Sequence, residues 1–255
     1  MKILKTVGKY AVLIYLIYLV PTILVNSVFS FLRETMVLGK YVCSIVLTNI
    51  LLVCAAIFIK NKKNISFSEL DFKLNKKNTY YLCITMIASI GFYMFKNLIY
   101  VIPAFKSSLE AVPNGFTVEM VNSLNHSIGW MVLPCVLVPI CEELFFRGIV
   151  LNDLIKQYGG IKGIIWGSAI FSILHGSSFI FVFPAFLVVG YVYYKKKNII
   201  YPMVFHISNN IFAALLGGIV RDCQSVDIVR FAVIGIIIIA LSVFLLYKDE
   251  RAIKK

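Results

Sequence analysis

The chain has 255 residues, of which 60% are hydrophobic and 15% are charged, and its mean hydropathy is +0.89. A soluble domain of this length is much more polar, so the composition predicts a polytopic membrane protein. The formal net charge of +13 does not indicate nucleic-acid binding, because Lys and Arg stand in short blocks beside apolar runs. Such blocks are typical topology signals. We therefore expect a lipid bilayer, and no nucleic acid, around this protein.

Crossing about 30 Å of hydrocarbon takes roughly 20 helical residues. Apolar runs of about this length predict an all-α bundle of about eight transmembrane helices, over residues 10–32, 41–59, 80–101, 128–151, 161–178, 179–194, 199–220 and 228–247. The apolar stretch 161–194 is too long for one span, so we divide it at Gly176-Ser177-Ser178. The first run is longer than the apolar part of a typical signal peptide, and we interpret it as an uncleaved span.

The positions of Lys and Arg predict the topology of this bundle. If the N-terminus is cytoplasmic, 19 of the 25 Lys and Arg residues fall on the cytoplasmic side and five on the opposite side, while Lys96 lies within the third span. Lys and Arg in short loops favour the cytoplasmic side. We therefore expect a multi-pass protein of the cell membrane with both termini in the cytoplasm.

Several polar side chains interrupt the apolar runs of the second half of the chain. An ionisable group at membrane depth costs a few kcal/mol, so it indicates a functional site with a partner close by. The group contains two acids, one guanidinium, two of the three histidines and one amide, which favours water-activating chemistry: Glu142, Glu143, Arg147, His175, His206 and Asn210.

Helical spacing relates these residues to one another. Side chains four residues apart share a helix face, which predicts the pairs Glu143 with Arg147, Phe171 with His175, and His206 with Asn210. Adjacent residues point about 100° apart on a helix of 3.6 residues per turn. Glu143 is therefore the expected partner of Arg147, and Glu142 is the carboxylate expected to face the interior of the bundle.

These motifs resemble the three signature motifs of the CPBP family, the CAAX proteases and bacteriocin-processing enzymes, also called the Abi family. The resemblance is carried by Glu142-Glu143-x-x-x-Arg147, Phe171-x-x-x-His175 and His206-x-x-x-Asn210, in this order, and covers roughly residues 132–214. It implies three regions: N-terminal helices over 1–127, a protease core over 128–220, and a last helix with a basic tail over 221–255.

The resemblance also implies a function, intramembrane proteolysis, with a polar cavity that opens towards the cytosol. The substrate would be a peptide or a membrane-anchored protein. Position by position, Glu142 would be the general base, assisted by His175, while His206 and Asn210 would stabilise the oxyanion. Glu143 and Arg147, with Phe171, would support the site. A carboxylate held in an apolar environment suits a base near neutral pH, and donors fixed on one helix face suit an oxyanion hole.

Two alternatives stay open at this point. Glu142, His175 and His206 would also make a plausible site for a divalent metal such as zinc, with one open position for water, although the chain has no H-E-x-x-H motif. We favour the metal-free glutamate mechanism. The non-enzymatic alternative is a bacteriocin immunity protein or a proton-relay transporter, and for the latter we find none of the internal repeats that transporters often carry.

Overall fold

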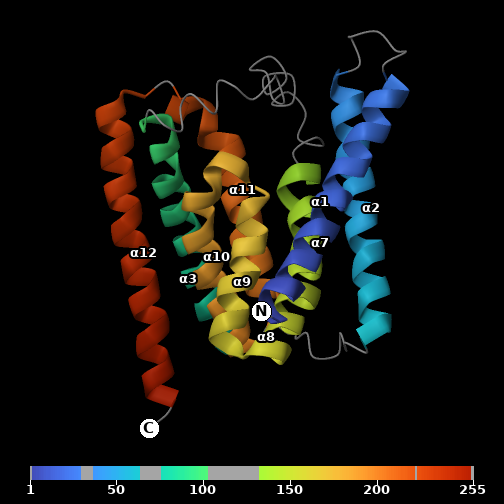
Figure 1. Ribbon diagram of the computed structural model, residues 1–255. Coiled ribbons are helices and arrows are strands. Elements are labelled where there is room, and N and C mark those ends of the chain that lie inside the picture. Colours follow the sequence, from blue (N-terminus) through green and yellow to red (C-terminus); the bar gives the residue numbers. More distant parts are fainter. Residues whose placement is uncertain (1, 30–36, 64–75, 103–131, 222, 254–255) are drawn as a thin grey trace.

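The computed structural model describes residues 2–29, 37–63, 76–102, 132–221 and 223–253, and all structural statements below refer to them. Within these ranges the chain is all-helical and forms no strand, which confirms the predicted fold class (Figure 1). The long elements are α1 (Lys2–Phe29), α2 (Val37–Lys63), α3 (Lys76–Lys96), α9 (Gly160–Ile173), α10 (Phe179–Lys196), α11 (Ile200–Arg221) and α12 (Ser225–Ile253). The short elements are η3 (Asn97–Tyr100), η4 (Leu133–Leu137), α7 (Val138–Phe145), η5 (Phe146–Leu151), α8 (Asn152–Tyr158) and η6 (Gly176–Ser178).

Six of these helices are long and apolar enough to cross a membrane, namely α1, α2, α3, α10, α11 and α12. The expected number of about eight is therefore reached only if two further segments are counted. One is α9, which is apolar but has only 14 residues. The other is the segment predicted over 128–151, which the structure describes from residue 132 onwards. The predicted division of 161–194 is confirmed, because the 3₁₀ turn η6 separates α9 from α10.

The segment from η4 to α8 alternates between π-helical and α-helical turns. In η4 the N–H of Val138 bonds to the carbonyl of Leu133, five residues back. The next donor in this pattern would be the N–H of residue 139, but Pro139 has none. A second π-helical segment, η5, follows α7 directly. Such π segments inside α-helices occur frequently at functional sites, and α7 between them carries both predicted acids.

Glycines allow close packing at two helix contacts. The Gly163-x-x-x-Gly167 face of α9 lies against the segment that precedes it, because a Cβ at Gly163 would be 2.6 Å from Ile155 and one at Gly167 would be 3.0 Å from Leu151. Small residues drive helix association in membranes by allowing this approach. The same device joins α3 to α12, where a Cβ on Gly235 would be 2.6 Å from the carbonyl oxygen of Gly91.

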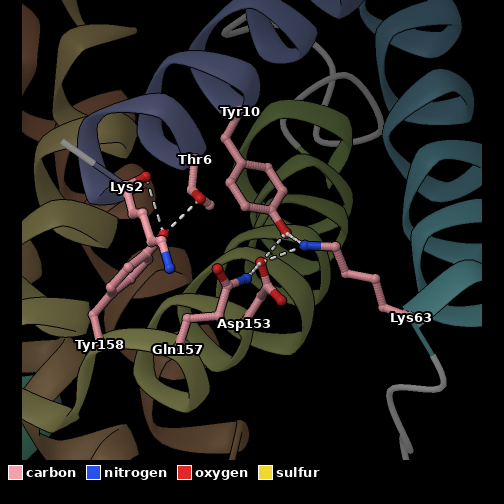
Figure 2. A network of polar contacts seen from close by, with 7 residues as sticks. All are labelled: Lys2, Thr6, Tyr10, Lys63, Asp153, Gln157 and Tyr158. Carbon is pink, nitrogen blue, oxygen red and sulfur yellow. Dashed lines mark hydrogen bonds and ion pairs between the residues drawn. The ribbon is translucent and has the colours of Figure 1, made fainter.

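A polar network fixes the start of α1 and the end of α2 to α8 (Figure 2). The buried carboxylate of Asp153 accepts hydrogen bonds from the hydroxyl of Tyr10 at 2.7 Å, the amide of Gln157 at 2.8 Å and the ammonium of Lys63 at 2.5 Å. Beside it, the hydroxyls of Thr6 and Tyr158 lie 2.6 Å apart. Because the Asp153 side chain is only 7% exposed, the Lys63 charge offsets a costly burial.

The start of α1 and the end of α12 lie at the same end of the bundle (Figure 1). The end of α2 and the whole of α8 also lie there, since the network of Figure 2 joins them to α1. We call this the terminal end of the bundle. It follows that the second half of α1 and the first half of α2 lie towards the opposite end.

Candidate active site

One cavity of about 680 Å³ lies among α1, α2, α3, η4, α7, α10 and α11. Its wall includes all four residues predicted to carry catalysis: Glu142, His175, His206 and Asn210. Tyr18 and Thr22 line it from the second half of α1, and Tyr41 and Ser44 from the first half of α2. The cavity therefore extends in the half of the bundle away from the terminal end. Its volume falls within the range of small-molecule and peptide-side-chain pockets.

Glu143 and Arg147 form an ion pair behind this cavity, as the spacing of four residues predicts. Oε2 of Glu143 lies 2.9 Å from Nε of Arg147, and the two side chains are 0% and 4% exposed. No donor among the described residues meets hydrogen-bond geometry at this oxygen, so the contact is ionic rather than an aligned hydrogen bond. The guanidinium also lies over the rings of Phe186, at 4.4 Å, and Phe171, at 5.2 Å. Such cation–π contacts add stabilisation when desolvated.

His206 lies between the two acids. Its Nδ1 is 2.9 Å from Oε1 of Glu143, and its Nε2 is 3.7 Å from Oε2 of Glu142. Glu143 thus contacts a different partner through each oxygen, and it orients the imidazole of His206 as a carboxylate does in many histidine sites. Because Nδ1 is engaged by Glu143, Nε2 is the nitrogen directed towards Glu142 and the cavity.

Glu142 is held from a distant part of the chain. The hydroxyl of Tyr18 on α1 donates a hydrogen bond of 2.7 Å to its Oε1, while Oε2 faces His206. The residue is 9% exposed and lines the cavity. The two adjacent acids therefore have different surroundings: Glu143 is enclosed, and Glu142 is in contact with the space where a substrate would bind.

His175 lies in the turn between α9 and η6. Its Nδ1 is 3.2 Å from the carbonyl oxygen of Phe171, one helical turn earlier. A carbonyl oxygen only accepts hydrogen bonds, so Nδ1 carries the proton and Nε2 keeps its lone pair. The ring of Phe171 stacks on Phe186 at 3.8 Å and meets the ring of His206 edge-on at 5.7 Å. Phe171 therefore packs against both predicted histidines.

Asn210 connects α11 to the π-helical turn η4. Its Nδ2 donates a hydrogen bond of 3.1 Å to the carbonyl oxygen of Pro134. This carbonyl is available because the residue five positions later is Pro139, which has no N–H. In the membrane an unsatisfied carbonyl would cost several kcal/mol. The amide of Asn210 satisfies it with one N–H and retains a second N–H at the cavity wall.

The residues proposed as metal ligands line one cavity but do not lie close enough together to share an ion. Among the described residues, no group of three His, Cys, Asp or Glu side chains is placed to hold a metal ion. Glu142 and His206 are neighbours, with 3.7 Å between Oε2 and Nε2, but His175 does not join them in a group that could share an ion. The donor set Glu142, His175 and His206 does not fit a metal site in this geometry, so we derive no chemical step from one.

Two residues at the cavity carry no sequence motif. Tyr18 lies 124 positions from the carboxylate that it contacts, and nothing in its surroundings distinguishes it from the other tyrosines of the apolar runs. Lys96, the last residue of α3, also lines the cavity. Its signal was present in the sequence, as a base within the third predicted span, although the motifs gave it no role.

The fold and this cavity define a class of protein, a helical membrane protein with acid and base groups inside its bundle. Residues 124–212, about a third of the chain, match the family model described as "Type II CAAX prenyl endopeptidase Rce1-like". The matched stretch contains every residue of the three motifs, and it confirms the predicted resemblance to the CAAX protease family, whose members are intramembrane endopeptidases. No curated protein and no solved structure matches the chain.

Proposed function

We propose that this protein hydrolyses a peptide bond of a membrane-associated peptide or protein, with a water molecule activated by Glu142. The observation that carries the proposal is that Glu142, His175, His206 and Asn210, from three separate segments, line one cavity. A family match alone would not require this convergence. An acid and two imidazoles at one cavity can supply a general base, and an amide beside them can donate to an oxyanion, which suits hydrolysis of a peptide bond.

The reaction follows from the contacts of these groups. Glu142 takes a proton from the water as its oxygen bonds to the substrate carbonyl carbon, and the lone pair on Nε2 of His175 holds the water in place. The carbonyl becomes an oxyanion, which accepts hydrogen bonds from His206 and from the free N–H of Asn210. Glu142 then returns the proton to the amide nitrogen as the C–N bond breaks. The products are a carboxylic acid and an amine.

The geometry supports these assignments in two ways. Glu143 contacts Arg147 through Oε2 and Nδ1 of His206 through Oε1, which fixes the imidazole so that its Nε2 is directed to the cavity. Tyr18 donates to one oxygen of Glu142 and leaves the other for the water. Preorganised donors of this kind are typically the largest contribution to catalysis of acyl transfer.

The test compares cells that carry the intact protein with cells that carry Glu142→Gln. New protein N-termini are identified by mass spectrometry, and Asp227→Asn serves as the control because it neutralises a carboxylate on the exposed surface, where Asp227 is 41% exposed. We expect N-termini that are present with the intact protein and with Asp227→Asn but absent with Glu142→Gln, at equal amounts of folded protein. If Glu142→Gln produces the same N-termini, Glu142 is not the base.

The metal question has its own experiment. We expect purified protein to stay active with a strong chelator, and His206→Ala and Asn210→Ala to bind substrate but cleave it about 100- to 1000-fold more slowly, the range for removing one oxyanion donor. Bound zinc in stoichiometric amount, lost in His206→Ala, would show instead that His206 is a metal ligand.

We also propose that both termini face the cytoplasm. The proposal is supported by the excess of Lys and Arg on the side of the membrane where the termini would lie. The cavity is then in the half of the bundle away from the cytoplasm, because Tyr41 and Ser44 near the start of α2 line it. This differs from the cytosolic opening that the family resemblance implies. Labelling of Ser44→Cys with an impermeant thiol reagent on intact cells would support a cavity away from the cytoplasm. Protection of this cysteine from the reagent would support the cytosolic opening.

A further inference from the structure

Lys96 places a positive charge in the cavity without a negative partner in the described part of the chain. It is partly buried at the end of α3, and it lines the same cavity as Glu142 and His206. The ion pairs among the described residues involve other cations, and no hydrogen-bond acceptor is assigned to its ammonium. A cation at membrane depth is costly and normally has a partner.

Glu142 does not serve as this partner. Its Oε1 faces Tyr18 on α1 and its Oε2 faces His206 on α11, so neither oxygen is directed to α3, which carries Lys96. Lys96 belongs to α3, which packs against α11 and α12. The cavity therefore carries its reactive carboxylate on one wall and, on another, an ammonium without an ion-pair partner in the part of the chain that the structure describes.

A second unsatisfied group lines the same cavity from α2. Asn49 on α2 donates its Nδ2 to the carbonyl of Ile45 at 2.8 Å, but its Oδ1 is buried without a donor among the described residues. Ser44 and Thr48 extend this polar strip along the cavity. The Oδ1 of Asn49 can accept a hydrogen bond from an N–H group of a bound peptide. In the same way, the ammonium of Lys96 can pair with an anionic group.

From these two groups we propose that Lys96 binds a carboxylate of the substrate, so that the protein prefers peptides with a carboxylate at a fixed distance from the bond that is cut. This inference rests on the proposed function and specifies its substrate class. The ammonium of Lys96 pairs with the carboxylate, the Oδ1 of Asn49 accepts from the peptide backbone, and the scissile carbonyl lies at Glu142 and His206. The carboxylate is supplied either by the C-terminus of the peptide or by an Asp or Glu side chain.

The experiment uses a mixture of synthetic peptides of random sequence, made once as free C-terminal acids and once as C-terminal amides. Cleavage sites are identified by mass spectrometry for the intact protein, Lys96→Gln and Lys96→Arg, with Lys9→Gln as the control because Lys9 is exposed on α1. We expect peptides with the carboxylate to be cut about 10- to 100-fold faster than peptides without it, the range for a hydrogen bond between charged groups. Lys96→Gln should abolish this preference and Lys96→Arg should retain it.

The two sources of the carboxylate give different results. If the C-terminus supplies it, amides are cut slowly whatever their sequence. If a side chain supplies it, amides are cut well and their cleavage sites share an Asp or Glu at one offset. Equal cleavage of acids and amides, with no acidic residue enriched at any offset, would show that Lys96 does not select a carboxylate.

A binding measurement separates this inference from the proposed function. The protein with Glu142→Gln, with and without Lys96→Gln, is incubated with the same two peptide mixtures, and retained peptides are identified. Selective retention of carboxylate-bearing peptides, lost in Lys96→Gln, supports the role of Lys96 even if the intact protein cuts none of them. Retention that is indifferent to the carboxylate contradicts it, whatever the cleavage assay gives.

Discussion

Glu143→Gln is expected to lower the free energy of unfolding by about 3–5 kcal/mol, the loss measured when one partner of a buried ion pair is removed. We expect a loss near the upper end of this range, because the side chain of Glu143 is 0% exposed and that of Arg147 only 4% exposed. Gln keeps the shape and can still accept the hydrogen bond from His206. The substitution therefore tests the charge of Glu143 rather than its packing.

The assay is denaturant unfolding in detergent, followed by intrinsic fluorescence, for a double-mutant cycle with Arg147→Met. Each single variant leaves one buried charge without its partner. The double variant removes both charges, and replacing a buried pair by neutral groups is often close to neutral for stability. We expect the double variant to recover at least about 2 kcal/mol relative to the sum of the single losses, within the range of couplings between contacting residues. Losses that simply add would refute the buried ion pair.

Three other outcomes follow from contacts described above. Tyr18→Phe should lower kcat about 10-fold or more without loss of folded protein, because a hydrogen bond to a charged group contributes about 1.5–3 kcal/mol; an unchanged kcat would remove Tyr18 from the site. Gly235→Val should reduce stability by about 1–3 kcal/mol, since even its Cβ would lie 2.6 Å from a carbonyl oxygen. Gly8→Ala, with nothing within 4 Å, is its control and should not lower the melting temperature, because Ala favours the helix over Gly. Lys197→Cys, in a chain without other cysteines, should resist an impermeant thiol reagent on intact cells, and labelling there would reverse the proposed topology.

Sequence reasoning succeeded where helix geometry alone determines a contact. The pair Glu143 and Arg147 lies on consecutive turns of one helical segment, so a spacing of four residues is enough to predict it. The division at Gly176 followed from length, because 34 residues exceed what one span needs.

The contacts that define the cavity were beyond this reasoning. His206 is 63 positions from Glu143, and Tyr18 is 124 positions from Glu142. Which faces of distant helices meet depends on how each helix is rotated and tilted in the bundle, and one sequence does not contain that information in any local pattern. The sequence also did not predict that α9 is short. The apolar run continues through the turn that ends this helix, so hydropathy does not mark its last residue.

The π-helical turns around α7 have a consequence for how this site tolerates change in chain length. On an α-helix one residue corresponds to about 100° of rotation. Deletion of one residue from η4 would convert its wide turn to an ordinary one and turn the preceding chain, with the Pro134 carbonyl, by roughly this angle relative to the two acids. The contact with Asn210 would be lost even though every motif residue remained. The number of residues between Leu133 and Glu142 is therefore as specific a requirement as the identity of the acids themselves.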